Sequence, residues 1–581
     1  MRLWTGSWVV LTAAAIAACS SALDDSAASP SRGSGNGTGS NIGGSTSLGG
    51  INSSGGGSAV VVPPEQEEDQ NFRAPVVSGR WVWTANPDTG KVAVIDAKNF
   101  TVRLADAGQA PTYLTALPSD ANTSKALVIN SKSQDATLLS AGDTGDVTAS
   151  SPIPLQPNAN TWAVSKSGHF AIAWTDSQGI MADPAEGFQD ISVVDLSVAS
   201  PVATRLGVGF LPSRVFIDDD ELRAFVVAST GITVIDLSTG APRVLGEKAV
   251  SSDLKEDATT RDVSILPDGS YALVRHEGSA TVTLVNLDPE QLSDATAKTL
   301  SDVVLPGPVT DLDLVADSTS ALAVVRGDPT PSTDADAGAG DANDSQAGAS
   351  GAGAANVGPE PVRSTLAILP IPGIFSAPSS FVSVSIDEVF GLVNIAPQGT
   401  EALLYTNAVA DSHITVLQTA RDSQSYLDHR TIDVHGNVKD VFPSPDGAYA
   451  IASLTPQTMG DKPGFAVVPV GAVLPSRTQT TEAPVFAVAQ SSRPLQRAVI
   501  TVSDGATNFA AYVVRMPELV VDRVVLPSQP LAGATGLVPD AGMAYIAESS
   551  PQGRITFIDL ETGVPRTITG FEISAKVIDG N

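Results

Sequence analysis

Short apolar runs separated by polar turns fill the chain from about residue 72 onwards. Each run is a few Val, Ile, Leu or Ala residues long, and Gly, Pro, Asp and Ser residues lie between the runs. Apolar runs of this length, bounded by turn residues, are typical of β-strands. No amphipathic helix of ordinary length interrupts the runs, so the pattern predicts an all-β protein.

One unit recurs ten times: a polar turn leads into a strand that begins with a small residue followed by aliphatic ones. Successive anchors of this unit lie 44, 45, 53, 48, 49, 81, 48, 48 and 46 residues apart, and they are Val82, Ala126, Ala171, Ala224, Ala272, Ala321, Ala402, Ala450, Ala498 and Ala544. Four short strands in about 48 residues are the size of a propeller blade. We therefore expect a β-propeller of about ten four-stranded repeats, either as one large ring or as two smaller rings.

The single long spacing coincides with an Asp/Ala/Gly-rich stretch at about residues 328–361. This composition predicts a disordered insertion, because it offers nothing to bury. Its carboxylates suggest calcium, but a calcium loop needs a closing Glu at a fixed position, and Glu360 is far from them. We predict no metal site. At the other end, residues 571–578 are expected to add a strand to the blade at the seam of the ring.

Two motifs connect the repeat to a known family. Pro-Asp-Gly turns occur at 267–269 and 445–447, and third strands end in Ile-Asp-Leu-Ser-Thr-Gly at 235–240 and Ile-Asp-Leu-Glu-Thr-Gly at 558–563. With these motifs, residues 72–570 resemble the YVTN-type β-propeller repeat. The resemblance implies a propeller of the kind found in surface-layer and periplasmic proteins.

The first 18 residues have the form of a signal peptide. The apolar stretch Leu3–Ala18 follows Met1 and Arg2, and it is shorter than the roughly 20 residues that a membrane span needs. It ends in Ile-Ala-Ala before Cys19, the only Cys of the chain, and this end resembles the lipobox of bacterial lipoproteins. The alternative is an ordinary secretory signal in which Cys19 is incidental.

The lipobox resemblance implies cleavage before Cys19 and attachment of lipid to this residue. The protein would then be held in the bacterial cell envelope by its N-terminal lipid. Ser20 favours the outer membrane, while the periplasmic or surface-exposed side is left open. Residues 19–71 are rich in Gly and Ser and predict a disordered tether with a reach of roughly 40 Å. The propeller region then covers residues 72–581.

Charge and composition exclude several functions. The chain carries 33 Lys plus Arg against 63 Asp plus Glu, a net charge of −30, which disfavours nucleic-acid binding. One Cys cannot form an intramolecular disulfide or ligate an iron–sulfur cluster. The propeller region contains neither a His-Glu-x-x-His nor a Gly-x-Ser-x-Gly motif. We assign no catalytic residue and no cofactor, and we expect a protein that is more readily a binder than an enzyme.

Charged residues lie near the entrance ends of the innermost strands of four repeats. In a ring they would converge on the central channel, where alternating signs could bind a polar or zwitterionic ligand; they are Arg214, Arg261, Asp262, Asp311, Asp313, Lys439 and Asp440. The alternative is that these charges pair with one another and only line a wet channel.

Long connections between the second and third strands of a repeat occur at 175–190, 327–363 and 453–464. They predict that elaboration is concentrated on one face, where loops on a rigid scaffold commonly bind partners. The sequence therefore favours a noncatalytic scaffold that binds a protein or a glycan on this face. The alternatives are a hydrolase or lactonase with its site at the channel mouth, and a passive surface-layer component.

Overall fold

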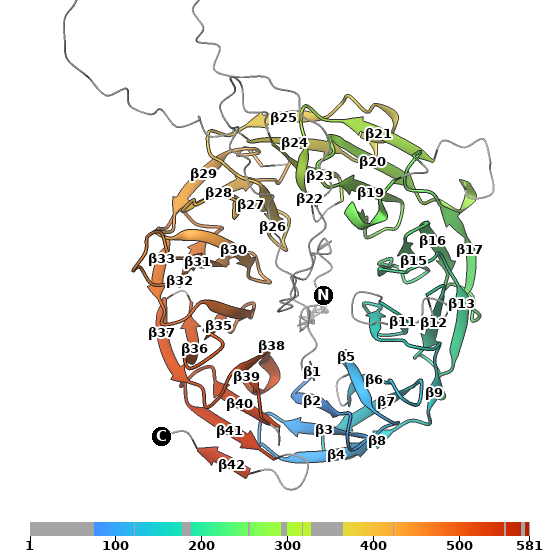
Figure 1. Ribbon diagram of the computed structural model, residues 1–581, viewed down its shortest axis with the longest axis vertical. Coiled ribbons are helices and arrows are strands. Elements are labelled where there is room, and N and C mark those ends of the chain that lie inside the picture. Colours follow the sequence, from blue (N-terminus) through green and yellow to red (C-terminus); the bar gives the residue numbers. More distant parts are fainter. Residues whose placement is uncertain are drawn as a thin grey trace, which may run out of the picture.

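The ten anchor residues each lie in the second strand of an antiparallel sheet, and the ten sheets form one ring in the computed structural model (Figure 1). The predicted ten-bladed propeller is confirmed, as a single ring rather than two. The structure describes residues 75–120, 123–176, 188–253, 256–291, 299–315, 318–326, 364–421, 423–516, 518–550, 553–570 and, as backbone, 576–579. The predicted signal peptide, Cys19, the predicted tether and the predicted insertion at 328–361 lie outside the described residues.

The strands of each blade follow one another from the inner edge of the ring to its outer edge. The strands of the first five blades are, in blade 1, β1 (Val76–Ser78), β2 (Trp81–Asn86), β3 (Lys91–Asp96) and β4 (Val102–Asp106); in blade 2, β5 (Pro111–Asp120), β6 (Thr123–Asn130), β7 (Asp135–Gly142), β8 (Val147–Ala149) and β9 (Ile153–Pro154); in blade 3, β10 (Thr161–Val164), β11 (Phe170–Trp174), β12 (Asp190–Asp195) and β13 (Ala203–Gly207); in blade 4, β14 (Arg214–Ile217), β15 (Arg223–Ala228), β16 (Gly231–Asp236) and β17 (Arg243–Lys248); and in blade 5, β18 (Arg261–Ile265), β19 (Tyr271–His276), β20 (Thr281–Asn286) and β21 (Leu300–Val304).

Blades 6 to 10 repeat the arrangement. Their strands are, in blade 6, β22 (Val309–Leu314), β23 (Ser320–Arg326), β24 (Ser364–Pro370) and β25 (Val382–Ser385); in blade 7, β26 (Leu392–Ile395), β27 (Glu401–Tyr405), β28 (His413–Gln418) and β29 (His429–Asp433); in blade 8, β30 (Asn437–Pro443), β31 (Tyr449–Thr455), β32 (Gly464–Pro469) and β33 (Arg477–Thr480); in blade 9, β34 (Val485–Gln490), β35 (Arg497–Ser503), β36 (Phe509–Arg515) and β37 (Val520–Val525); and in blade 10, β38 (Pro530–Val538), β39 (Met543–Glu548), β40 (Arg554–Asp559), β41 (Pro565–Thr569) and β42 (Lys576–Asp579). Within the described residues, the helices are α1 (Gly373–Ser376) and the short 3₁₀ turns Ala258–Thr260, Pro289–Gln291 and Pro539–Ala541.

The core lies between blades rather than within them. Each cluster of buried apolar residues is drawn from two neighbouring blades. All ten anchors are completely buried, and each packs against the preceding blade. Ala126 meets Trp81 and Trp83 of blade 1, and Ala272 meets Phe225 of blade 4. A small residue at this position lets the large side chains of the previous blade fit against the sheet.

The Pro-Asp-Gly turn at 267–269 shows why its glycine is required. Gly269 has a φ of +64°, and a Cβ atom at this position would lie 2.5 Å from the ring of Phe225 in the neighbouring blade. A side chain would therefore be disfavoured both by the backbone conformation and by the close approach of blade 4.

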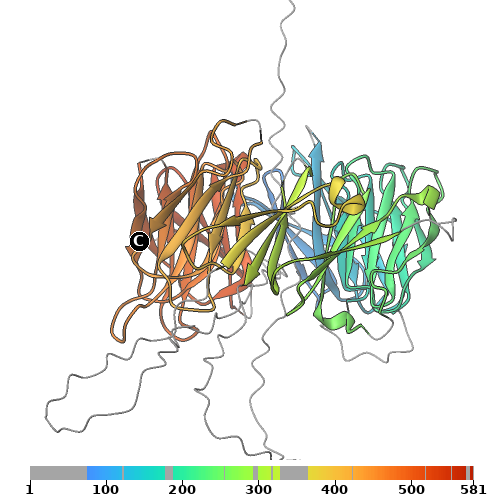
Figure 2. The same ribbon diagram turned by 90° about the horizontal axis from the view of Figure 1, so that it is seen from above.

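The antiparallel order places two sets of connections on opposite faces of the ring (Figure 2). Connections from second to third strands and from one blade to the next share one face, which we call the b–c face. The strand ends that flank the long connections at 175–189, 327–363 and 456–463 lie on it, as predicted. However, long connections also join third to fourth strands on the other face, at 287–299, 371–381 and 419–428. The expectation that elaboration is concentrated on one face is wrong in this respect.

The ring closes where blade 1 meets blade 10, and no strand is exchanged between them. The Tyr545 hydroxyl donates a hydrogen bond of 2.8 Å to the Pro75 carbonyl. The rings of Phe100 and Phe557 meet edge to face with centroids 5.5 Å apart, and the Arg566 guanidinium lies 5.1 Å from the Phe100 centroid. Strand β42 pairs with β41, which confirms the extra strand predicted at the seam.

Removing the Tyr545 hydroxyl tests this closure. We expect Tyr545→Phe to lower the free energy of unfolding by roughly 1–3 kcal/mol, because the buried Pro75 carbonyl loses its donor. Hydrogen exchange of the backbone amides should accelerate first at Val76 and Val77. The seam is the interface at which the chain does not run directly from one blade into the next, so it opens most easily. Tyr449→Phe is the matched control, because the Tyr449 hydroxyl bonds to no other described residue. Equal effects of the two substitutions would contradict a special role of the seam.

Candidate functional site

The charged residues predicted at the channel lie on the inner strands, whose free edges need partners for their backbone groups. Asp311 and Asp313 in β22 meet this need for the next blade. The Asp311 carboxylate accepts the Val393 amide at 2.7 Å, and the Asp313 carboxylate accepts the Ile395 amide at 2.9 Å. Both carboxylates are buried. They fasten β22 to β26.

Arg261 and Asp262 in β18 make comparable contacts. Arg261 donates to Glu256 at 2.6 Å and to the Ala228 carbonyl of blade 4 at 2.8 Å. Asp262 lies 3.2 Å from the Arg275 guanidinium, which also donates to the Thr310 carbonyl of blade 6 at 2.6 Å. Sequence reasoning missed Arg275, although it lies directly opposite Asp262 in the register of β18 and β19.

The other predicted residues are Arg214 in blade 4 and Lys439 and Asp440 in blade 8. Arg214 donates to the Val263 carbonyl of blade 5 at 3.3 Å. In blade 8, the Lys439 carbonyl accepts the Asn407 side chain at 3.2 Å, and the Asp440 amide donates to Ser453 at 3.1 Å.

The structure thus brings the predicted residues of blades 4, 5 and 6 together along adjoining inner strands and leaves Lys439 and Asp440 two blades away. Neutral side chains make the same kind of bond elsewhere: Asn394 donates to the Val441 carbonyl and Gln490 to the Phe442 carbonyl. Some of these contacts lie within one blade, as between Asp262 and Arg275, and the others join neighbouring blades. A ligand role for the seven residues stays a prediction.

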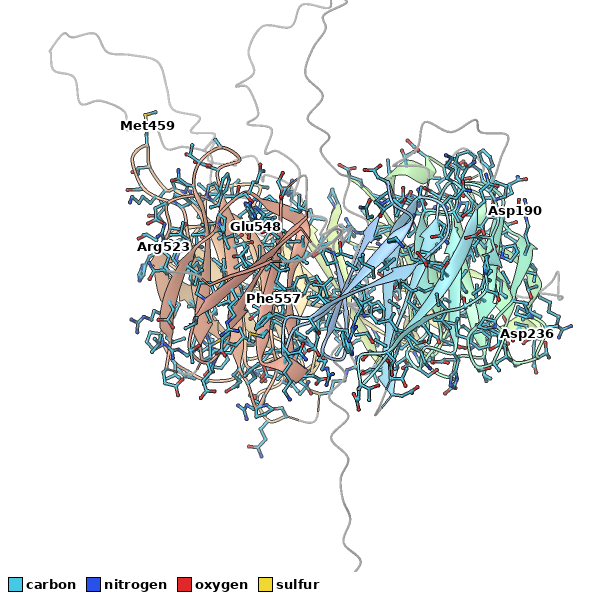
Figure 3. The ribbon with its side chains drawn as sticks, turned by 90° about the horizontal axis from the view of Figure 1, so that it is seen from below. Asp190, Asp236, Met459, Arg523, Glu548 and Phe557 are labelled. Atoms are coloured by element: carbon cyan, nitrogen blue, oxygen red, sulfur yellow. The ribbon has the colours of Figure 1, made fainter. Side chains whose placement is uncertain are left out.

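A polar groove of about 280 Å³ lies on the b–c face between blades 8 and 9. Lys462 comes from the connection that carries the fully exposed Met459, and Arg523 comes from β37 below it (Figure 3). The groove is lined by Lys462, Gln479, Thr480, Thr481, Glu482, Tyr512, Val521 and Arg523. Sequence reasoning did not find it, because its residues come from four separate segments and form no motif.

Glu482 is the centre of the groove's hydrogen bonds. The Tyr512 hydroxyl donates to its carboxylate at 2.6 Å, and Arg523 Nε lies 3.3 Å from the same oxygen. The bond from Tyr512, with help from Arg523, holds the pKa of Glu482 below its ordinary value. Burial raises the pKa of Tyr512. At neutral pH the groove therefore presents an ionised carboxylate and a protonated phenol.

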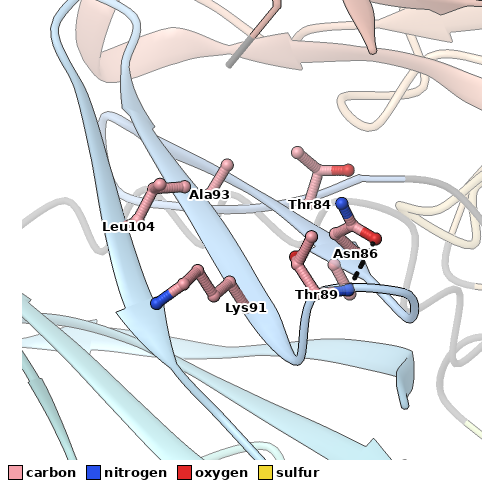
Figure 4. A pocket seen from close by; sticks show the side chains of 7 residues that line it. Thr84, Asn86, Thr89, Lys91, Ala93 and Leu104 are labelled. Carbon is pink, nitrogen blue, oxygen red and sulfur yellow. Dashed lines mark hydrogen bonds between the residues drawn. The ribbon is translucent and has the colours of Figure 1, made fainter. Parts of the chain in front are cut away.

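A second hollow is much smaller. It has a volume of about 90 Å³ and lies on blade 1, where Lys91 and Leu104 face the turn that follows Asn86 (Figure 4). The Thr89 amide donates to the Asn86 side chain at 3.3 Å and shapes this turn. The volume is well below the roughly 300 Å³ of small-molecule sites.

Glu548 is a buried carboxyl at the end of β39. It accepts hydrogen bonds from the Ser528 amide at 2.8 Å and from the Thr556 hydroxyl, and it is 2% exposed. Burial raises its pKa above the ordinary value of 4.5. Its hydrogen bonds are all within blade 10 and the connection that precedes it, so Glu548 is part of the blade's internal structure.

The described part of the chain offers neither a cluster of metal ligands nor a membrane-spanning helix. No three His, Cys, Asp or Glu side chains in this part of the chain are grouped so that they could hold a metal ion. None of its helices is both long and apolar enough to cross a membrane.

Comparisons with known proteins give distant structural matches. No protein-family model and no curated protein matches the chain. Among solved structures, a eukaryotic initiation factor matches at 11% identity with a TM-score of 0.48, covering 79% of this chain and 96% of its own. Dihydro-heme d1 dehydrogenase NirN in complex with DHE matches at 11% identity and a TM-score of 0.40, covering 78% and 73%. A putative 6-phosphogluconolactonase from Bacteroides fragilis matches at 12% and 0.32, covering 71% and 92%.

The structural part played by the inner carboxylates can be measured. We expect Asp313→Ala to lower the free energy of unfolding by roughly 1–3 kcal/mol, because the Ile395 and Leu314 amides both lose their acceptor. Asp106→Ala, which removes an exposed carboxylate paired with Lys91, should change it by less than about 0.5 kcal/mol. Denaturant titration of the two variants compares them. An Asp313 variant as stable as the Asp106 variant would refute the role as a fastener between blades.

The buried Glu548 predicts a pH dependence of stability. Because its pKa is raised on folding, the folded state binds more protons than the unfolded state, and stability falls as the pH rises from about 4.5 through the raised pKa. Glu548→Gln cannot titrate, and its amide can still bond to Ser528 and Thr556. We expect the variant to gain stability relative to the wild type across this window. Thermal melts at pH 4.5 and 7.5 measure the difference, and an identical difference at both pH values would contradict it.

Proposed function

We propose that the protein is a noncatalytic binding propeller, held in the bacterial cell envelope by a lipid on Cys19, that presents its b–c face to a protein or glycan partner. The chemistry of the groove between blades 8 and 9 carries this proposal. General acid–base catalysis is most efficient when the pKa of the catalytic group lies near the working pH. The pKa of Glu482 is lowered and that of Tyr512 is raised, so both groups are suited to hydrogen bonding rather than to proton transfer.

The position of the groove supports the same function. Ten packed interfaces hold the blades, and the groove is formed where two of these blades meet beneath a projecting connection. A rigid wall with an adaptable loop above it is a common arrangement for binding sites. The lipobox at Cys19 and the Gly/Ser-rich stretch after it support an envelope anchor, with a tether that lets the ring turn toward its partner. The YVTN-like motifs agree with this location.

A photo-crosslinking residue at Met459 tests the proposal in cells of a Gram-negative host. We expect capture of one recurrent protein or glycan from the membrane fraction, because Met459 projects from the b–c face. The matched control is a crosslinker at Val473, an exposed position in the connection that follows β32 on the opposite face. In a Cys19→Ser background the protein should leave the membrane fraction.

Each result bears on a separate part of the proposal. Equal capture from Met459 and Val473, or no capture from Met459, would overturn the role of the b–c face. Capture of only a second copy of the chain would favour a surface-layer component. Membrane retention of the Cys19→Ser protein would overturn the lipid anchor.

A further inference from the structure

The groove between blades 8 and 9 holds hydrogen-bonding groups that no other described residue uses. Arg523 donates through its Nε to Glu482 and also hydrogen-bonds the Tyr512 side chain, and because a guanidinium carries five N–H donors, some remain for a ligand. The ammonium group of Lys462 is without a described partner. Glu482 accepts Tyr512 and Arg523 on one oxygen, Oε2, and its own backbone amide also donates to the carboxylate; lone pairs of Oε1 remain to accept a further bond. Donors with positive charge and an acceptor thus share one small space.

Packing holds these groups in place before any ligand arrives. The Tyr512 ring meets Phe465 of blade 8 edge to face, with centroids 5.7 Å apart, and it is almost completely buried. Tyr512 also lies opposite Arg523 in the register of β36 and β37. The Thr481 amide donates to the Pro463 carbonyl at 2.8 Å and fixes the residue after Lys462. Preorganised groups lose little conformational entropy on binding, which favours affinity.

The local charge selects the class of ligand. Lys462 and Arg523 contribute two positive charges and Glu482 one negative charge, so the groove carries a net charge of +1 in a chain whose net charge is −30. A ligand with one negative charge would balance the charge of the groove, whereas the second negative charge of a phosphate would be repelled by the Glu482 carboxylate. Gln479, Thr480 and the Glu482 acceptor suit several hydroxyl groups. The volume of about 280 Å³ is close to the lower end for small-molecule sites.

We propose that this groove binds an acidic saccharide unit, with its carboxylate between Lys462 and Arg523 and its hydroxyls on Glu482 and Gln479. The inference rests on the proposed function, because it names the class of ligand that the b–c face takes. The unit can be a free sugar acid or part of a polymer, and the chemistry of recognition is the same for both.

Calorimetric titration of the purified full-length protein tests the inference. We expect D-glucuronate to bind and D-glucose and acetate to bind at least tenfold more weakly, because each lacks either the carboxylate or the hydroxyls. Binding of glucuronate should weaken as salt is added. A tetramer of galacturonate binds more tightly than the monomer if the natural ligand is a polymer and equally if it is a free sugar acid.

Variants separate the groove from the rest of the surface. Lys462→Gln and Arg523→Gln should each weaken glucuronate binding at least tenfold. Arg205→Gln is the matched control: Arg205 also lies on an outer strand, β13, and pairs with a carboxylate, Asp190, at 2.6 Å, but it lies far from the groove in the ring. It should leave binding unchanged. Lys462 is exposed on a connection, so its variant keeps the test valid if Arg523→Gln impairs folding.

The outcomes are distinguishable from those of the crosslinking experiment. No glucuronate binding, equal binding of glucose, or equal effects of the Arg523 and Arg205 variants would overturn the saccharide inference. Capture of a protein from Met459 would still support the proposed function in that case. Conversely, glucuronate binding that depends on Lys462, without any capture from Met459, would support the saccharide site and count against a macromolecular partner.

Discussion

Packing of each blade against its neighbours is the interaction on which the whole structure depends. A four-stranded sheet of this composition has two apolar faces and cannot bury either one alone. The completely buried anchors, from Val82 to Ala544, allow each sheet to approach the one before it closely. Burial of all ten interfaces requires a closed ring, and closure depends on side chains at the seam, since no strand crosses it. The contacts of Tyr545, Phe100 and Phe557 therefore hold blades 1 and 10 together, where the chain does not connect them.

A ring of this kind has ten inner strands with free edges. The backbone groups at these edges need hydrogen-bond partners, and the charged residues there supply them. Asp311 and Asp313 accept amides of β26, and Arg261 and Arg275 donate to carbonyls of neighbouring blades. Such charges resemble a binding site in the sequence because a site and a capped edge both need polar groups at the ends of inner strands. Lys462 and Arg523 line a groove on the b–c face instead, where donors remain for a ligand.

The repeat, the strand order and the strand added at the seam could be predicted from the sequence. The second strand of each blade has its anchor residue at the same position, and this residue is required by the close packing of neighbouring blades. The number of rings could not, since it depends on the small angle between blades, which side-chain volumes set and residue spacing does not. The inner charges could be located, but their partners could not: Asp311 bonds to Val393, 82 residues away and beyond a long insertion. The groove was missed for the same reason, because Lys462, Glu482, Tyr512 and Arg523 meet only after blades 8 and 9 have packed.

The proposed site is thus a product of the interface itself. The Phe465–Tyr512 contact belongs to the core between blades 8 and 9, and the same Tyr512 positions Glu482 in the groove. Comparable interfaces recur around the ring, but the polar residues at their outer ends differ. Arg205 of blade 3 pairs with Asp190 alone, whereas Arg523 of blade 9 shares a groove with Glu482, Tyr512 and Lys462 and has donors left for another molecule. In such a fold the packing repeats and supplies rigidity, while function depends on the few blade junctions at which hydrogen-bonding groups are left over.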